Sequence, residues 1–416
     1  MTRPVRVALV YDAVYPFQKG GGERRFHEIA RQLAADGAEV TLYGMRWWPG
    51  PERTRVVDGV RVHALCRGRP LYTRSGRRSI GQALIFGLAC LKLLWHRHDV
   101  IDCSGFPFFS LFSCRLVATL RRTPLISTWH EVWGPDYWRE YLGRLGPIGA
   151  LVERLAARLP DRIIVVSPST GRRLRRDLGS RQPVHLMPNG FDPAVMLGAQ
   201  PAEDAAEVVF VGRLIAPKGV DLLIGAVAQL AAAGRPVRCQ IIGEGPEEAR
   251  LRALARRLAV EHLVSFAGTL PSAGDVFAAM KGARVLALPS VREGFGMVAL
   301  EANACGIPVI TVDHPDNAAA DLVEHRHTGW VVRPTAQQLA EAIDEALRAP
   351  AADPTAIARH VDRYAWPRLA RDHALSELYS ASGPNGAGVA IPAPRRAADD
   401  ATDIRELQES APWSAS

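Results

Sequence analysis

Residues 284–312 read RVLALPSVREGFGMVALEANACGIPVITV and contain one strand–loop–helix–strand unit. Arg284–Leu288 is a short apolar run that predicts a buried strand, and Pro308–Val312 predicts a second one. Between them, a glycine-rich loop leads into Met297–Cys305, which has the apolar content of a packed helix. This alternation of strand and helix predicts a parallel sheet with helices on both of its faces.

The same alternation runs through most of the chain in two series. The first series begins with the strand pattern Val5–Tyr11, and the second begins with Glu207–Val211. The expected fold class is therefore α/β, with two Rossmann-like, doubly wound lobes that face each other across a cleft, and ligands are expected beyond the carboxyl ends of the strands. The expected segments are a first lobe over residues 1–191, a linker over 192–206 and a second lobe over 207–363.

Charge is divided unevenly between the two halves of this 416-residue chain. Residues 1–190 contain 30 Lys and Arg against 15 Asp and Glu, whereas the remaining residues contain 21 against 28. A basic first half indicates an anionic partner, such as phosphate groups or an acidic membrane surface. A solvated, Arg-rich surface from a biased genome would give the same composition.

Several features bear on the compartment. The six cysteines are scattered, without a Cys-x-x-Cys pair or a metal-binding spacing, which favours a reducing environment. The start of the chain does not have the pattern of a secretory signal. The apolar stretch Ala83–Trp95 contains Lys92 and is shorter than the roughly 20 residues that a membrane span needs, so we expect a buried helix there. We therefore expect the protein in the cytoplasm or peripheral to the inner face of the cell membrane.

One candidate anion site follows the strand Glu207–Val211. Gly212, Arg213 and Lys218 lie in a loop between this strand and a predicted helix, where backbone amides attract anions. Two cations five residues apart can bracket a diphosphate. An ordinary pair of surface charges is the plainer alternative.

A second candidate site lies at the carboxyl end of the strand Arg284–Leu288. Glu293 occupies the glycine-rich loop, and Glu301 lies about one turn into the following helix. Carboxylates accept hydrogen bonds from paired sugar hydroxyls, as acidic residues do for the ribose in dinucleotide folds. The helix dipole would explain an acid at the helix start, but it does not explain Glu301 within an apolar helix.

Residues 289–310 resemble the hallmark segment of the retaining glycosyltransferases of family 4, also called glycosyl transferases group 1, which have the GT-B fold. The resemblance extends over roughly residues 5–380. Further matching features, in chain order, are Gly20–Arg24, His130, Asn189-Gly190 and Gly212…Lys218. The family ends in a helix that crosses back onto the first lobe, which we expect here in residues 364–380. The Gly-, Pro- and Ala-rich residues 381–416 predict a disordered tail.

The resemblance implies roles for individual residues. Arg213 and Lys218 would bind the donor diphosphate and stabilise the leaving nucleotide, and Glu301 would hold the ribose. Glu293 and neighbouring backbone amides would hold the donor sugar, which His130 would also contact. The predicted catalytic residues are therefore His130, Arg213, Lys218 and Glu293, and the predicted donor-binding residues are Gly20, Gly21, Gly22, Gly212, Gly294, Phe295, Gly296, Met297, Val298 and Glu301.

Some residues leave alternatives open. A lone histidine such as His130 is more often structural, and the aromatic residues that follow it suit a protein core as well as a sugar ring. The sequence also departs from the family pattern at two places. Asp313–Asn317 replaces a commoner glycine-rich turn, and Glu131 stands where many relatives have Asp.

The predicted function is transfer of a hexose from a UDP- or GDP-sugar, with retention, to a glycan, a glycolipid or another hydroxyl acceptor in cell-envelope or exopolysaccharide synthesis. No Asp-x-Asp motif is found, so we expect a metal-independent reaction with no cofactor besides the nucleotide-sugar substrate. Expected partners are that donor, a glycan or lipid-linked acceptor and an anionic membrane, but no nucleic acid.

The main alternative is a catalytically inactive nucleotide-sugar-binding protein of the same fold. A dehydrogenase or epimerase is disfavoured because no Gly-x-Gly-x-x-Gly follows the first strand.

Overall fold

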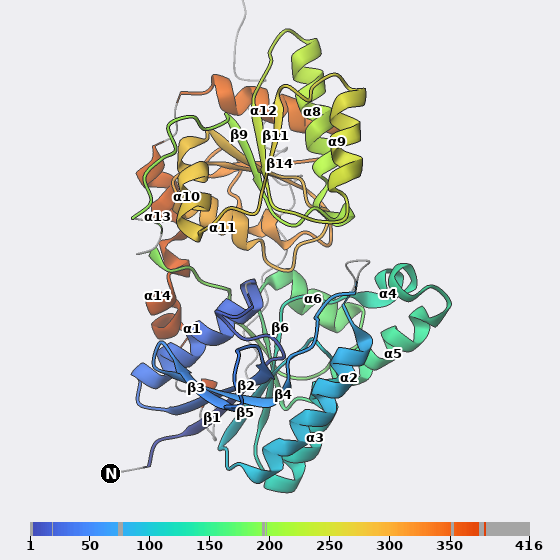
Figure 1. Cartoon of the computed structure of the whole chain (residues 1–416), viewed down its shortest axis with the longest axis vertical. Helices are drawn as coiled ribbons and strands as arrows, with labels where there is room; N and C mark the ends of the chain where they lie inside the picture. Colours follow the sequence, from blue (N-terminus) through green and yellow to red (C-terminus); the bar gives the residue numbers. More distant parts are fainter. Residues whose placement is uncertain are drawn as a thin grey trace, which may run out of the picture.

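The computed structural model describes residues 3–18, 20–73, 78–193, 196, 198–350, 353–373 and 378–379. The predicted tail over 381–416 lies outside these residues, as do parts of the predicted linker. The described chain forms two lobes, each built on one sheet and placed one above the other in Figure 1. The prediction of two Rossmann-like α/β lobes is confirmed.

The sheet of the first lobe is almost entirely parallel. Its order is β3-β4-β2-β1-β5-β6-β7-β8. The order reverses at β1, which pairs with β2 on one side and β5 on the other, so loops that follow these strands meet at one edge. The parallel strands are β1 (Arg6–Val10), β2 (Glu39–Arg46), β4 (Val60–Arg67), β5 (Val100–Ser104), β6 (Leu125–Trp129), β7 (Arg162–Val165) and β8 (Val184–Leu186).

The edge of this sheet is a β-hairpin. The strand β3 (Thr54–Val57) pairs antiparallel with β4, and Asp58 and Gly59 form the turn with φ values of 48° and 80°. An Asp-Gly pair between alternating apolar residues is a strong hairpin signal, because both turn positions need positive φ. The alternation of strands and helices had left this hairpin unpredicted.

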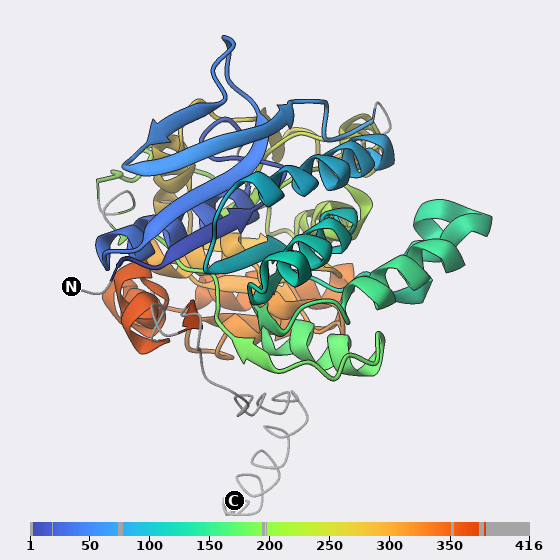
Figure 2. The same ribbon diagram turned by 90° about the horizontal axis from the view of Figure 1, so that it is seen from below.

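Helices cover both faces of the first sheet. In Figure 2, α1 (Gly21–Ala35) and α14 (Trp366–Asp372) lie on one side, and α2 (Ile80–Ala89) and α3 (Phe109–Arg121) lie on the other. The remaining helical elements of this lobe are η1 (Cys90–Trp95), α4 (Gly134–Leu142), η2 (Gly143–Leu145), α5 (Gly146–Ala156) and α6 (Pro168–Arg176). Within the described residues, no helix combines the length and the apolar composition needed to cross a bilayer.

The expected burial of Ala83–Trp95 is wrong in part. Ala83, Phe86 and Cys90 are buried against the sheet, but Leu88 and Trp95 are 68% and 76% exposed. An apolar run of this kind has no polar face to mark which side meets solvent, so its composition alone could not reveal the exposed side.

The second lobe has a fully parallel sheet in the order β11-β10-β9-β12-β13-β14, which is the Rossmann order. The helix α8 packs against α9 and α12, and α11 packs against α10 and α13. The strands are β9 (Val208–Val211), β10 (Cys239–Ile242), β11 (Val264–Gly268), β12 (Val285–Leu288), β13 (Val309–Val312) and β14 (Gly329–Val332). The helices are η3 (Ala216–Lys218), α8 (Val220–Ala232), α9 (Glu248–Arg257), α10 (Ala273–Gly282), α11 (Met297–Ala304), η4 (Ala318–Leu322), α12 (Ala336–Arg348) and α13 (Pro354–Val361), followed by η5 (Asp362–Tyr364).

The chain crosses between the lobes twice, and the two crossings pair with each other. The amide of Phe191 donates to the carbonyl of Tyr364 at 3.1 Å, and the amide of Trp366 donates to the carbonyl of Phe191 at 3.2 Å. After the second crossing, α14 packs on α1. Further along, the hydroxyl of Tyr379 donates to the buried carboxylate of Asp102 at 2.5 Å. The end of the described chain is therefore anchored in the first lobe.

Tyr379→Phe should lower the free energy of unfolding by about 1–3 kcal/mol, because Asp102 would lose a hydrogen-bond donor in a buried setting. Tyr364→Phe is the matched control, since its hydroxyl donates no hydrogen bond to the described residues. Urea unfolding of both variants measures the difference, and equal midpoints would contradict the anchor.

Candidate active site at the junction of the lobes

The loops after β9 and β12 lie against each other, since these two strands are neighbours in the sheet. The amide of Val291 donates to the carbonyl of Pro217 at 2.9 Å. Gly219 has a φ of 63°, and a Cβ at this position would lie 2.3 Å from the carbonyl oxygen of Pro289. Only glycine therefore allows this approach. As a result, the Nζ of Lys218 lies 2.5 Å from a carboxylate oxygen of Glu293.

The loop after β10 supports the Arg213 loop from the other side. Gly243 has a φ of 131°, and a Cβ there would lie 2.0 Å from the carbonyl oxygen of Gly212. The amide of Leu214 donates to the carbonyl of Glu244 at 2.9 Å. The turn at Gly243 therefore positions the loop that carries Arg213.

The segment Asp313–Asn317 supports the Glu293 loop. The amide of Glu293 donates to the carbonyl of Asp316, and the amide of Ala318 donates to the carbonyl of Glu293, both at 2.9 Å. Close by, Gly296 adopts a φ of 94°, and a Cβ there would lie 2.5 Å from that of Ala319. The segment that departs from the family pattern thus fixes the backbone of a predicted catalytic residue.

Glu301 lies at the junction of the lobes with 16% of its side chain exposed. Burial raises its pKa to about 7, and the positive charge of Arg24 opposes this rise. The guanidinium of Arg24, in α1 of the first lobe, lies 3.9 Å from the carboxylate. Arg24 was not among the predicted site residues, although it belongs to the matching segment Gly20–Arg24.

The glycine loop of the first lobe reaches the second lobe and His130. A Cβ on Gly21 would lie 3.2 Å from Cγ of Met297, and one on Gly22 would lie 3.4 Å from Nε2 of His130. That Nε2 is buried and has no hydrogen-bond partner among the described residues. Burial lowers the pKa of His130 to about 3, so its imidazole is neutral at physiological pH. A neutral ring with a vacant polar atom is able to bind a sugar hydroxyl.

The backbone of His130 also contacts the second lobe directly. A Cβ on Gly294 would lie only 2.2 Å from the carbonyl oxygen of His130. The structure therefore brings together Gly20–Gly22, His130, Lys218, Glu293, Gly294, Met297 and Glu301 at one junction.

Two predicted residues have side chains that point elsewhere. Phe295 is buried and packs edge-on against Tyr364, with ring centroids 6.1 Å apart. Arg213 is exposed, and its guanidinium lies 4.5 Å from the ring centroid of Tyr72 in the first lobe. Gly212 lies in the loop that carries Arg213, and the half-buried Val298 lies in α11, which begins two residues after Phe295. No motif or spacing in the sequence indicates Tyr72.

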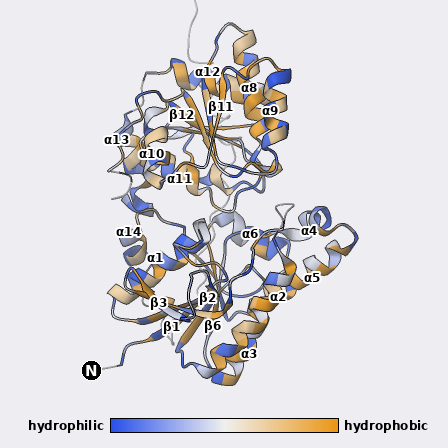
Figure 3. Ribbon diagram, in the orientation of Figure 1, coloured by the Kyte–Doolittle hydropathy of each residue, from blue (hydrophilic) through white to orange (hydrophobic). Residues whose placement is uncertain are grey.

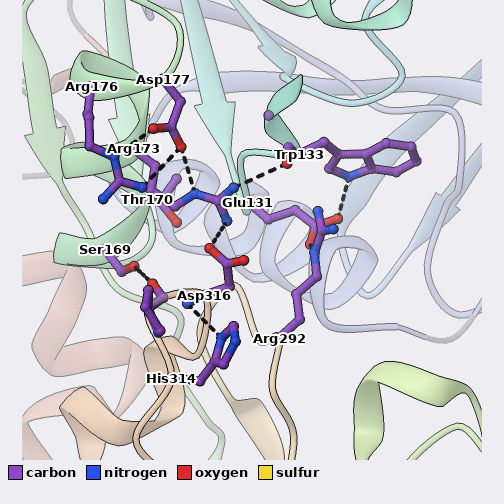
Figure 4. Close-up of polar contacts among 12 residues, drawn as sticks. Glu131, Trp133, Ser169, Thr170, Arg173, Arg176, Asp177, Arg292, His314 and Asp316 are labelled. Atoms are coloured by element: carbon purple, nitrogen blue, oxygen red, sulfur yellow. Dashed lines mark hydrogen bonds and ion pairs between the residues drawn. The ribbon is translucent and has the colours of Figure 1, made fainter. Parts of the chain in front are cut away.

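Polar contacts from both lobes surround the junction (Figure 4). In α6, Arg173 forms an ion pair with Asp316 at 2.7 Å and donates to the carbonyl of Trp133 at 3.1 Å. Arg292 lies 3.4 Å from the carboxylate of Glu131, which also accepts from the indole of Trp133 at 2.6 Å. Both departures from the family pattern, Glu131 and the segment with Asp316, thus take part in contacts between the lobes.

Within the part of the chain that the structure describes, one group of potential metal ligands gathers in the second lobe. It consists of Glu324, His327 and His360, whose ligand atoms lie within 4.8 Å of one another. None of these residues is among those predicted to bind the donor.

Comparison with solved structures places this architecture among known folds. Sucrose-phosphate synthase from Thermosynechococcus elongatus superposes with a TM-score of 0.68 at 20% identity, covering 98% of this chain and 100% of that chain. Anabaena HepE, in a complex with UDP-glucose, gives 0.66 at 19% identity, covering 89% and 98%. This chain therefore has the two-lobed GT-B fold of these proteins.

Sequence comparison gives the family. The model for Glycosyltransferase Family 4 matches residues 19–195, and the model for Glycosyl transferases group 1 matches residues 198–361. The chain belongs to this family of transferases. Glycogen synthase from Mycobacterium tuberculosis is 28% identical over 74% of this chain and 78% of its own length. The D-inositol 3-phosphate glycosyltransferase of Jonesia denitrificans is 28% identical over 83% and 88%.

Because the pKa of Glu301 is raised to about 7, the residue is neutral below this pH and ionised above it. Folding raises the pKa of Glu301, so the protonated residue favours the folded state. This contribution to stability is complete below the pKa that Glu301 has in the unfolded chain, and it is lost as the pH rises through 7. We expect a nucleotide sugar to bind more tightly at pH 8 than at pH 6, because an ionised carboxylate is the better acceptor for ribose hydroxyls. Calorimetric titration measures this difference. Glu301→Gln should remove it, and an unchanged pH profile in this variant would contradict the assignment.

Gly294→Ala should lower kcat/KM at least about tenfold, because a misplacement near 1 Å can cost about a hundredfold in rate. The new methyl group would overlap the carbonyl of His130 and displace the Glu293 loop. Gly274→Ala in α10 is the control, since its Cβ would meet no atom closer than 3.4 Å. Initial rates for both variants decide the point, and equal rates would show that the contact is unimportant.

Proposed function

We propose that this protein transfers a hexose from a UDP- or GDP-sugar to a hydroxyl acceptor with retention of the anomeric configuration. The observation that carries the proposal is the convergence of Lys218, Glu293, Glu301 and His130 at the junction of the lobes. A cation for phosphate, a carboxylate for ribose and a neutral ring for the sugar are the groups that a nucleotide sugar requires.

Cleavage of the donor leaves a nucleoside diphosphate anion and an oxocarbenium-like sugar. The main catalytic need is therefore positive charge on the departing diphosphate. Lys218 meets this need in the proposal, and its contact with Glu293 holds its ammonium group at the loop before the donor arrives. Arg213 adds a second positive charge from the start of the same loop, where it is exposed and lies over the ring of Tyr72.

His130 serves as a neutral hydrogen-bonding group for the donor sugar. Its lowered pKa excludes an imidazolium at neutral pH, so it does not compete with Lys218 for the phosphates. Retention in this proposal follows from attack on the same face as the leaving group, with the departing phosphate taking the proton of the acceptor hydroxyl. No bound metal is needed in the proposed step, because side-chain cations neutralise the leaving group.

The acceptor is proposed to be a glycan or lipid-linked sugar used in cell-envelope or exopolysaccharide synthesis. The basic composition of residues 1–190 supports an acceptor with anionic groups or one carried on an anionic surface. The alternative of an inactive nucleotide-sugar-binding protein predicts donor binding without turnover.

A thermal-shift series of UDP- and GDP-sugars identifies the donor class, because a ligand that binds the native state raises Tm. Lys218→Ala should lower kcat by about a hundredfold to a thousandfold, in the range found when one group that stabilises developing charge is removed. Arg257→Ala, at an exposed position in α9, is the control. Donor binding without sugar transfer to any acceptor or to water would favour the inactive alternative. No stabilisation by any nucleotide sugar would contradict the proposal.

A further inference from the structure

Large apolar side chains are exposed at the surface of the first lobe in one restricted region. Among the described residues, fourteen large hydrophobic side chains are exposed, and eleven of them belong to α2, η1, α3, η2 and α5. Isolated exposed apolar residues are ordinary, whereas their concentration in one place indicates a binding surface. The eleven are Ile80, Leu84, Leu88, Trp95, Phe112, Leu116, Leu120, Leu145, Ile148, Leu151 and Leu155, which together we call the apolar face.

The spacing of these residues makes the face continuous along each helix. In α2 and in α3 the exposed residues recur every four positions, which places them one above the other on one side of a helix. The two helices touch, since a Cβ on Gly87 would lie 2.9 Å from Cβ of Phe109. The helix α3 also packs against α5. Figure 3 shows apolar residues along all three helices on the outer side of this lobe.

The charges beside the apolar face are all of one sign within its own elements. The segments α2, η1 and α3 contain no Asp or Glu. The single carboxylate of α5, Glu153, is buried and accepts from the backbone amides of Trp133 and Gly134. Exposed arginines lie within α3, η2 and α5 or shortly after the ends of η1, α3 and α5, and none of them forms an ion pair with the described residues: Arg97, Arg121, Arg122, Arg144, Arg154 and Arg158.

We propose that the apolar face docks onto an anionic lipid bilayer. Leu, Ile and Phe side chains at this surface would enter the acyl region, Trp95 would lie at the headgroup level, and the arginines would contact anionic headgroups. Charge complementarity selects this occupant over a second copy of the chain, because two such faces would bring unpaired arginines together. The face lies on the outside of packed helices, so docking requires no segment that spans the membrane.

The apolar face approaches the proposed active site at its upper end. Ile80, the first residue of α2, lies two positions after Arg78, which forms a β-bridge with Tyr72. The ring of Tyr72 in turn contacts Arg213. A lipid-linked acceptor in the docked bilayer would therefore reach the junction of the lobes beside α2. Docking itself does not rest on the proposed sugar transfer, since it uses other residues.

Vesicle co-sedimentation of the full chain tests the proposal without any donor. We expect binding to phosphatidylcholine vesicles that contain about 30% phosphatidylglycerol, and much weaker binding to phosphatidylcholine alone, because basic residues near the surface are attracted to anionic headgroups. The double variant Leu88→Glu with Leu116→Glu should lower the binding at least about tenfold, since it removes apolar contact and adds repulsion. Arg122→Glu with Arg154→Glu should weaken it and reduce its dependence on salt.

The control is Val56→Glu, which also replaces an exposed apolar residue by a glutamate but does so in β3, outside the apolar face. Thermal unfolding confirms that each variant is folded, and donor-induced stabilisation reports separately on the proposed active site. Three results would overturn the proposal: no binding to anionic vesicles, equal binding by the Leu88/Leu116 variant, or a dimer in solution that this variant dissociates. The last result would assign the face to a second copy of the chain.

Discussion

The contact between Gly294 and His130 joins the two lobes and leaves no room for a side chain. Gly294 of the second lobe lies so close to the carbonyl oxygen of His130 that any Cβ would overlap it. This approach brings the loop with Glu293 to the end of β6, where His130 projects. On its other side, the loop is held by two backbone hydrogen bonds, from the amide of Glu293 to Asp316 and from the amide of Ala318 to Glu293. Gly294 has no side chain whose conformation could adjust if the loop were displaced, so the position of the loop depends on its backbone hydrogen bonds.

The same closeness determines the electrostatics of the junction. Water is largely excluded from Glu301 and His130, and desolvation therefore moves both groups toward their neutral forms. At the same junction, the ammonium group of Lys218 lies 2.5 Å from a carboxylate oxygen of Glu293. In the proposed reaction, Lys218 is the cation for the diphosphate, and the carboxylate of Glu301 and the neutral imidazole of His130 form hydrogen bonds with sugar hydroxyls. The fold determines where Glu301 and His130 lie, and their burial determines their protonation states.

The sequence was informative where local rules apply and uninformative where distant segments meet. Buried parallel strands leave continuous apolar runs, so both lobes and the segment with Glu293 and Glu301 could be predicted. Arg24, Arg173 and Arg292 could not be assigned, because an arginine on a helix or loop looks the same whether it faces solvent or the other lobe. The exposed side of Ala83–Trp95 was hidden for a related reason. Its outward residues are as apolar as its inward ones, so periodicity carries no information there.

The pairing of Phe191 with the segment Tyr364–Trp366 has a mechanical consequence. Both covalent connections between the lobes pass through one place, at the side of the molecule where α14 lies in Figure 1. Two chain segments that are hydrogen-bonded to each other at one edge oppose translation of one lobe past the other, but they permit rotation of the lobes about that edge. Displacement during such a rotation grows with distance from the axis, so α4 and the neighbouring aromatic residues of the first lobe would travel farthest from the second lobe. Substrates would therefore enter and leave on the side opposite the paired connections. The ion pairs of Arg173 with Asp316 and of Arg292 with Glu131 join the two lobes and would hold them in the closed arrangement.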